Sequence, residues 1–280
     1  MNKVPEKQEI DYLVIGHITQ DITPQGSRIG GTAAYAALLA HRFNLQVGMI
    51  TSFPEDFKPS LPGDIQLINV PAEQSTVFEN KYTSQGRKQV VHSIASKITA
   101  DHIPTPWRSA KIVHLAPVFN EFSPHLGKQF PHAHLGFTLQ GWLRTRNAAG
   151  QVNPTLWGAF PDFNSRSAAA VVSSEDLDDQ QDWIPTLKSS FPVLILTTGD
   201  QGAVLYQQDH PSQKIPVDPV PELDPTGAGD IFAAAFFITY FQGVPLQDAA
   251  RQAAVLAGQS VTRAGLSAIP QISDNQSTEE

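Results

Sequence analysis

The chain has 280 residues, of which 41% are hydrophobic, and its formal net charge is −8. This length accommodates one large α/β domain with a substantial buried core, and two domains of equal size are not favoured. The negative charge argues against nucleic acid or another polyanion as a partner, and the absence of cysteine excludes disulfides, thiolate catalysis and cysteine-type zinc sites.

The N-terminal residues 1–9 are polar and charged and contain no apolar segment of a signal peptide. No apolar run elsewhere is long enough to span a bilayer. We therefore expect a soluble, cytoplasmic protein without a membrane partner, in which any phosphate recognition is local rather than spread over a basic surface.

A strand, a loop, a helix and a second strand follow one another near the start of the chain. The strands are expected at residues 11–18 and 46–52, and the helix at residues 32–43. This order predicts a parallel α/β sheet, in which ligands bind at the carboxyl ends of the strands. Asp21 and the pair Gly30-Gly31 fall at that edge, although Asp21 taken alone is more typical of an ordinary turn before Thr23-Pro24.

Three short strand-like segments come next, at residues 66–70, 76–83 and 88–98. The last two are joined by Ser84-Gln85-Gly86-Arg87, which is a hairpin turn signal. Their alternating polar and apolar residues predict an exposed antiparallel sheet, and a plain surface hairpin explains the same pattern equally well.

Further buried strands are predicted at residues 111–118, 134–139 and 168–172. His114, His132 and His134 lie near one another in the sequence but have no carboxylate at metal-ligand spacing. We interpret them as surface or core histidines rather than as a zinc site.

The clearest strand is predicted at residues 193–198, and Gly199-Asp-Gln-Gly202 turns it into another at residues 203–207. A helix is expected at residues 246–262, with Gly265 as its end. The polar tail at residues 273–280 is expected to be disordered.

The stretch Asp224-Pro-Thr-Gly-Ala-Gly-Asp230 precedes an apolar run at residues 231–241 that reads as a buried helix. Its glycines allow close approach of a ligand to the backbone, and free N–H groups at a helix start favour an anion. An additional carboxylate, that of Asp230, would repel an anion unless it had a task, and the task we infer is to accept a proton. A glycine-rich turn with a capping aspartate is the simpler alternative.

The spacing of these glycines excludes two other phosphate-binding loops. A Walker A loop requires Lys-Ser or Lys-Thr after its last glycine, and the dinucleotide fingerprint requires a third glycine where Phe232 stands. A nucleotide-cofactor oxidoreductase is therefore not favoured.

The 224–230 stretch resembles the signature of the ribokinase-like (PfkB-type) carbohydrate kinases, Asp-Thr-x-Gly-Ala-Gly-Asp, with Pro225 in place of the usual threonine. The resemblance extends from Gly16 to Gly265, with the elements in the family's order. It implies a three-layer α/β/α sandwich over residues 1–280, with a mostly parallel sheet and a small antiparallel β lid from about residues 66–98. In this family the lid covers the substrate and sometimes makes a homodimer contact.

The resemblance also assigns roles to residues. Asp230 would be the catalytic base, and the amides of Gly227, Ala228 and Gly229 would form an anion hole for the transferred phosphoryl group. The implied cofactors are ATP and Mg²⁺. The implied nucleotide contacts are Thr198, Gly199, Gly202, Thr226, Gly227 and Gly229.

On the substrate side, the family's first-strand aspartate corresponds to Asp21, whose carboxylate can accept two charge-assisted hydrogen bonds from vicinal hydroxyls. Gly30-Gly31 resembles the family's Gly-Gly motif, and Tyr35 stands where an asparagine often follows it. Gln140-Gly-Trp-Leu-Arg144 is similar to a segment of inositol-type kinases, so Arg144 would face an anionic group, or else pair with a surface acid.

The family's Asn-x-x-Glu motif, which organises Mg²⁺ through water, would correspond to Ser173 and Asp176, with Glu175 adjacent. A helix N-cap explains these residues almost as well. Our first hypothesis is an ATP-dependent kinase acting on a hydroxyl of a small carbohydrate or polyol, including nucleosides. The alternative is a catalytically silent nucleotide- or sugar-binding regulatory member of the same fold.

Overall fold

The computed structural model describes residues 9–24, 26–83, 86–156, 160–163, 167–178 and 180–272. The predicted tail at residues 273–280 and the hairpin residues Ser84 and Gln85 lie outside these residues. Within them, no helix is long and apolar enough to cross a membrane.

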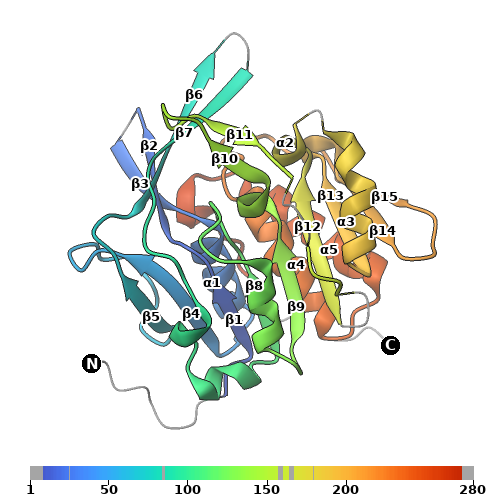
Figure 1. Ribbon diagram of the computed structural model, residues 1–280. Helices are drawn as coiled ribbons and strands as arrows, with labels where there is room; N and C mark the ends of the chain where they lie inside the picture. Colours follow the sequence, from blue (N-terminus) through green and yellow to red (C-terminus); the bar gives the residue numbers. More distant parts are fainter. Residues whose placement is uncertain are drawn as a thin grey trace.

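A nine-stranded sheet runs through the centre of the molecule (Figure 1). Its order is β15 (Gln213–Ile215), β14 (Ala203–Gln207), β13 (Val193–Thr197), β12 (Ala168–Ser173), β9 (His134–Thr138), β8 (Ile112–Leu115), β1 (Tyr12–Ile15), β4 (Val47–Phe53) and β5 (Gln66–Pro71). The strands from β13 to β5 are parallel, whereas β14 pairs antiparallel with both of its neighbours, β13 and β15. The buried apolar runs of the sequence thus form a mostly parallel sheet, as predicted.

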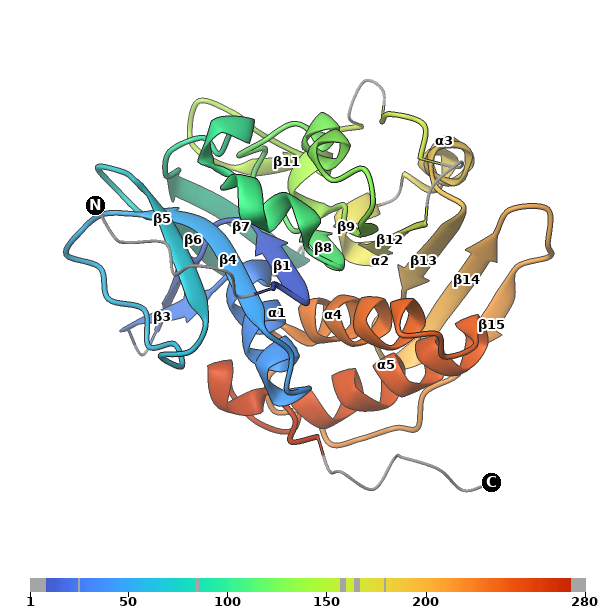
Figure 2. The ribbon, with the colours of Figure 1, turned by 90° about the horizontal axis from the view of Figure 1, so that it is seen from below.

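Helices α1 (Thr32–Arg42), α4 (Ala228–Phe241) and α5 (Leu246–Ser260) lie together on one face of this sheet (Figure 2). The other face carries α2 (Ser174–Leu177), α3 (Ile184–Ser190) and several short 3-10 turns. These turns are η1 (Ala100–His102), η2 (Thr105–Ser109), η3 (Pro124–Gln129), η4 (Gln140–Leu143) and η5 (Gln181–Trp183). Each face has its own hydrophobic core, so the predicted three-layer α/β/α sandwich is confirmed.

Helix α4 is apolar around most of its circumference, and its residues from Ile231 to Thr239 are buried. A helix of this kind must be covered on all sides. It packs between α1 and α5 and also against β8, β9 and β12. At the N-terminus of the helix Gly229 is exposed and Asp230 is half-buried, so a ligand can reach this end.

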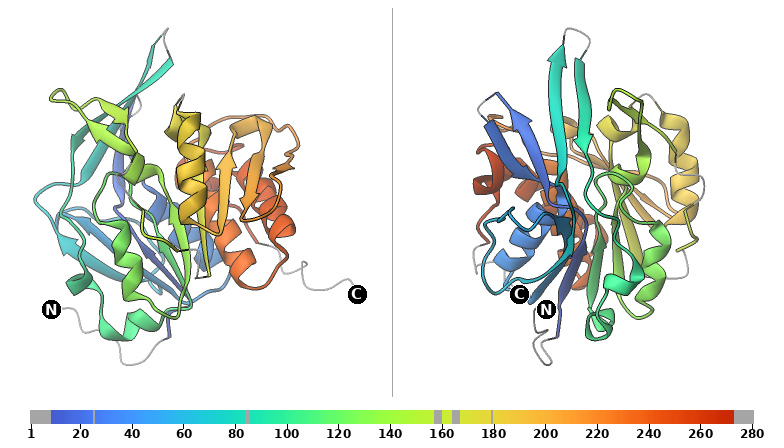
Figure 3. Two further views of the ribbon diagram at one scale, coloured as in Figure 1. Left: turned by 45° about the vertical axis from the view of Figure 1, so that its right-hand side comes forward. Right: turned by 60° about the vertical axis from the view of Figure 1, so that its left-hand side comes forward.

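A second, small sheet projects from the edge of the sandwich (Figures 1 and 3). Its strand order is β3 (Gly26–Gly30), β2 (Thr19–Thr23), β6 (Thr76–Thr83) and β7 (Gly86–Ser93). The pairs β2–β3 and β6–β7 are antiparallel, but β2 and β6 are parallel. A two-stranded hairpin of β10 (Arg144–Arg146) and β11 (Val152–Pro154) adjoins it, and Val91 N donates to Gly150 O at 2.9 Å.

The prediction that residues 66–98 form the small sheet was wrong in two respects. Strand β5 pairs in parallel with β4, so it belongs to the large sheet. In its place, β2 and β3 complete the small sheet, which puts Asp21 in a strand rather than in a turn. An alternating pattern is shared by any half-covered strand, so it could not distinguish the edge of the large sheet from the small sheet.

The end predicted for the last helix was also wrong. Helix α5 ends at Ser260, and Gly265, with φ of 59°, begins the 3-10 turn η7 (Gly265–Ala268). The turn packs against β3, which brings residues 265–268 to the small sheet.

Candidate active site

Residues 224–230 (the α4 turn) comprise the loop before helix α4 and the first three residues of the helix, and they are built around Gly227. This residue is the N-cap of the helix and has φ of 85°. A Cβ atom at Gly227 would lie 2.4 Å from Cε1 of Tyr35. Both the left-handed backbone and the tyrosine ring therefore require glycine at this position.

The N–H groups of the α4 turn are not all free. Ala228 N, whose amide is predicted for the anion hole, donates to Pro225 O at 3.1 Å. Among the described residues we find no hydrogen-bond partner for the N–H groups of Gly227, Gly229 or Asp230. Nothing in the structure lies within 4 Å of a Cβ built on Gly229, so the start of the helix faces open space.

Asp230 lies in the first turn of α4 and accepts a hydrogen bond from the hydroxyl of Thr32, with Oγ1 2.7 Å from Oδ1. Burial raises the pKa of Asp230 to about 7, against the hydrogen bond from Thr32. The charges of Asp176 and Asp21 raise this pKa further and that of Arg144 lowers it. A carboxyl group that titrates near neutrality is suited to exchange protons.

Thr32 was not singled out in the sequence. It is the first residue of α1 and directly follows Gly31, which is the N-cap of this helix and has φ of 90°. The available signal was a hydroxyl residue placed next to a double glycine at a helix start.

Asp21 and Gly30 are brought together across the β2–β3 pair. A Cβ on Gly30 would lie 2.3 Å from Oδ2 of Asp21, so the carboxylate rests on the glycine backbone. Thr19 Oγ1 donates to Oδ1 of Asp21 at 3.0 Å. On Gly31, which has φ of 90°, a Cβ would lie 2.5 Å from the carbonyl oxygen of His17, so the backbone requires glycine there. At Gly30 only side-chain atoms lie this close.

Tyr35 lies on α1 with only 1% of its surface exposed, and its ring packs on Gly227. Its hydroxyl is buried and has no hydrogen-bond partner within the described part of the chain. Burial raises the pKa of Tyr35, and the negative charge of Asp230 adds to this effect, so the phenol stays protonated. The side chain thus offers an unused donor close to the α4 turn.

Arg144 is paired with an acidic side chain of the protein, as the second of its two interpretations predicted. The acid is buried, however, rather than on the surface. Arg144 Nη2 lies 3.0 Å from Asp176 Oδ1, and the two side chains are 12% and 8% exposed. Gln140 Nε2 donates to the same oxygen at 3.2 Å. The guanidinium also lies over the ring of Phe78 in the small sheet, 6.0 Å from its centre.

The two residues predicted to face Mg²⁺ through water, Asp176 and Glu175, lie on α2. Asp176 holds Arg144, and Glu175 is exposed on α2. Ser173 Oγ accepts from Glu175 N at 3.0 Å, so the N-cap interpretation is confirmed. No group of three metal-ligating side chains occurs among the described residues.

The turn after β13 is closed by its own hydrogen bonds. Thr198 donates to Gly202 O through its N–H at 2.8 Å and its hydroxyl at 3.0 Å. A Cβ on Gly202, which has φ of 85°, would lie 2.1 Å from Ile215 O, so this glycine is needed for the turn. Gly199 has no such neighbour and leaves the outer side of the turn open.

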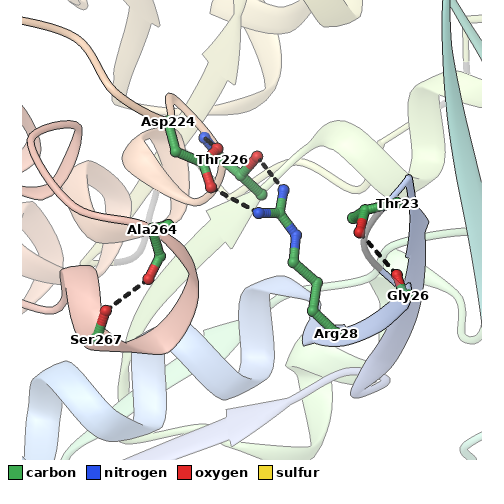
Figure 4. A network of polar contacts seen from close by, with 7 residues as sticks. All are labelled: Thr23, Gly26, Arg28, Asp224, Thr226, Ala264 and Ser267. Atoms are coloured by element: carbon green, nitrogen blue, oxygen red, sulfur yellow. Dashed lines mark hydrogen bonds and ion pairs between the residues drawn. The ribbon is translucent and has the colours of Figure 1, made fainter.

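Arg28, on β3, was not identified from the sequence, although it contacts the α4 turn. Its Nη1 lies 2.6 Å from Asp224 Oδ2 and its Nη2 lies 2.7 Å from Thr226 Oγ1 (Figure 4). The hydroxyl of Thr226, a predicted nucleotide contact, is therefore engaged by the protein itself.

Comparison with known proteins agrees with this arrangement. Residues 153–272 match the family model of the pfkB family carbohydrate kinases. The chain is 26% identical over 263 residues to a cytidine kinase of Thermococcus kodakarensis, covering 86% of this chain and 92% of that relative. It is 29% identical over 252 residues to a nucleoside kinase of Methanothermobacter thermautotrophicus, covering 81% of this chain and 76% of the relative.

Among solved structures, a pyrophosphate-dependent kinase in the ribokinase family, complexed with a pyrophosphate analog and myo-inositol, is similar with a TM-score of 0.72. The identity is 17%, and the likeness covers 93% of this chain and 100% of that chain, which shows a shared fold. The family model that matches residues 153–272 and the two kinase relatives thus make this chain similar to the pfkB family carbohydrate kinases.

Proposed function

We propose that this protein transfers the γ-phosphoryl group of ATP to a hydroxyl of a nucleoside or of another small unphosphorylated sugar or polyol. The observation that carries the proposal is the carboxyl group of Asp230, which lies one residue from Gly229 at a helix start facing open space. A proton acceptor beside an anion-binding helix start is what transfer of a phosphoryl group to an alcohol requires.

In the proposed reaction the carboxylate of Asp230 takes the proton of the acceptor hydroxyl. The hydroxyl oxygen forms a bond to the γ-phosphorus, the bond from that phosphorus to the bridging oxygen breaks, and ADP leaves. Thr32 would hold the carboxylate through its 2.7 Å hydrogen bond to Oδ1, and Oδ2 is the oxygen proposed to take the proton. Effective proton transfer depends on such positioning.

The free N–H groups of Gly227 and Gly229 would bind the transferred phosphoryl group. They lie at the N-terminus of α4, which spans Ala228–Phe241, so the partial positive charge of the helix end adds to their effect. Preorganised donors of this kind stabilise charge that develops in a transition state. The family resemblance also implies Mg²⁺, and Asp176 and Glu175 stay the residues proposed to face it through water.

Asp21, on β2 of the small sheet, is proposed to bind vicinal hydroxyls of the acceptor. The small sheet would act as a lid. Tyr35 supports the same location, because its buried hydroxyl has no partner among the described residues and needs one. The two relatives named as cytidine and nucleoside kinases favour a ribose of a nucleoside over a free polyol. The named complex with myo-inositol keeps inositols as the second acceptor class.

Thr198, Gly199 and Gly202 remain proposed contacts of the nucleotide, through the open outer side of their turn. The same named complex contains a pyrophosphate analog, so pyrophosphate is the alternative donor. A homodimer contact through the small sheet also remains a prediction.

The test is a coupled assay of phosphoryl transfer with ATP or pyrophosphate against nucleosides, pentoses, hexoses and inositols. We expect turnover with ATP and at least one nucleoside. Binding of ATP, measured by calorimetry, without turnover on any acceptor would instead support the catalytically silent alternative. That alternative draws on Asp176 being committed to Arg144 and on the replacement of the family's asparagine by Tyr35.

A further inference from the structure

Arg28 connects the small sheet to the α4 turn without lying in the proposed catalytic machinery. It comes from β3, whose hairpin with β2 is closed by Thr23 Oγ1 donating to Gly26 O at 2.7 Å (Figure 4). Its guanidinium spans the side chains of Asp224 and Thr226, which immediately precede Gly227. A planar guanidinium fixes two acceptors at once, which a lysine ammonium does less well.

The same turn is anchored from two other directions. Thr226 N donates to Asp224 Oδ1 at 3.0 Å, so the aspartate holds the backbone of the turn. Leu223 N and Asp224 N donate to Val261 O, at the end of α5, at 2.8 and 3.1 Å. These contacts together hold the conformation of the α4 turn. Within them, Arg28 is the residue that links the turn to the small sheet.

The positive charge of Arg28 also acts on Asp224. Asp224 is 14% exposed, and although burial opposes ionisation, hydrogen bonds from Thr226 and Arg28 and the charge of Arg28 hold its pKa below the usual value. An ionised carboxylate three residues before Gly227 would repel phosphate groups bound at the helix start. The guanidinium neutralises it at close range.

We propose that Arg28 is a positioning residue of the proposed phosphoryl transfer. Its fixed positive charge comes from the small sheet and neutralises Asp224. It also holds the α4 turn in the conformation that directs the Gly227 and Gly229 amides at the donor phosphate. This inference rests on the proposed function. It predicts that the position of the small sheet and the geometry of the helix start are coupled, because one side chain belongs to both.

The test compares Arg28→Ala, Arg28→Lys and the control Arg251→Ala, whose arginine pairs with Asp248 on the exposed surface of α5. For Arg28→Ala we expect kcat to fall about tenfold to a hundredfold, because a displaced binding group costs about that much. The KM for the donor should rise, while the KM for the acceptor stays close to that of the wild type. The Tm should fall modestly, because Asp224 loses its counter-ion. Arg28→Lys should recover part of kcat, since it keeps the charge but not the fork.

Chemical rescue provides a readout that a purely structural role would not move. Guanidinium ion, added well below unfolding concentrations, should restore part of the activity of Arg28→Ala and none to Arg251→Ala. An unchanged kcat in Arg28→Ala overturns the proposal. So does a loss of kcat that is matched by a fall in Tm and is rescued neither by lysine nor by guanidinium.

A second measurement separates this proposal from the proposed function. Backbone amide hydrogen exchange of residues 224–229 and the rise in Tm caused by ATP can be measured without turnover. Faster exchange and a smaller rise in Tm in Arg28→Ala support the role of Arg28 even if the wild type phosphorylates no acceptor. Unchanged exchange and an unchanged rise refute it even if the wild type is an active kinase.

Discussion

The hydroxyl of Thr32 donates to Oδ1 of Asp230 at 2.7 Å, although 198 positions separate the two residues in the chain. Thr32 is the first residue of α1, and Asp230 lies in the first turn of α4. The contact therefore joins the N-termini of two helices that pack side by side. Because Thr32 directly follows Gly30-Gly31, it links the proposed base to the proposed acceptor site.

Replacing Thr32 by valine keeps the shape of the side chain and removes this hydrogen bond. We expect kcat to fall about tenfold. Because the bond favours the ionised carboxylate, the pKa of Asp230 should rise, and the acidic limb of the profile of kcat/KM against pH should move to higher pH. Thr32→Ser should behave like the wild type, and a valine variant with an unmoved profile would contradict the assignment.

Removing the carboxylate itself, in Asp230→Asn, should lower turnover by on the order of a hundredfold or more while ATP still binds. Steady-state turnover and calorimetry measure the two effects separately. Near-wild-type turnover would remove Asp230 as the base.

Asp230 also predicts how stability depends on pH. Its pKa rises from 3.8 to about 7 in the folded protein, so between these values the folded state binds more protons than the unfolded state. Stability from this group is full at low pH and is lost as the pH rises through about 7. Asp230→Asn cannot ionise, so its Tm should exceed that of the wild type by several degrees near pH 8 and by less near pH 5, as measured by calorimetry.

Two glycines of the α4 turn allow function to be separated from stability. Gly229→Ala meets no atom within 4 Å and should leave the Tm unchanged or slightly raised, since alanine is favoured in helices by up to about 1 kcal/mol. Its methyl group would enter the space proposed for the phosphoryl group, so kcat should fall. Gly227→Ala should instead lower stability by about 1 to 3 kcal/mol, because its φ is 85° and Tyr35 lies in the way. A Gly229→Ala variant with the kcat of the wild type would show that the transferred phosphoryl group does not bind at this position.

Gly30→Ala tests the acceptor site. The added Cβ would displace the carboxylate of Asp21, so the KM for the acceptor should rise about tenfold while that for ATP changes little. Gly63→Ala, which meets no atom within 4 Å, is the matched control. Equal changes in both KM values would indicate a general distortion instead.

The ion pair of Arg144 and Asp176 predicts a shift opposite to that of Thr32→Val. Asp176→Asn removes a negative charge that raises the pKa of Asp230, so the acidic limb should move to lower pH. It also leaves the guanidinium without its buried counter-ion, which should lower the Tm. Asp248→Asn, in an exposed pair, serves as the control and should change neither quantity.

Much of the architecture could be read from the sequence. The apolar runs of β1, β4, β8, β9, β12 and β13 indicated a parallel sheet, because strands covered on both faces need apolar residues at nearly every position. The α4 turn indicated its own conformation, since Gly227 occupies a backbone region open mainly to glycine. The small sheet was predicted only in part, because pairing partners are not encoded in the alternation of a single strand.

What the sequence by itself determined was local: a helix start with glycines and a carboxylate, a double glycine before an alanine-rich helix, and strands apolar enough to be buried. The tertiary structure alone decided that Thr32 holds Asp230, that Arg28 ties β3 to Asp224 and Thr226, and that Asp176 pairs with Arg144. Those contacts join segments far apart in the chain, and hydrogen bonds act over only about 3 Å. They exist because packing brings the segments together, which no local pattern of residues records.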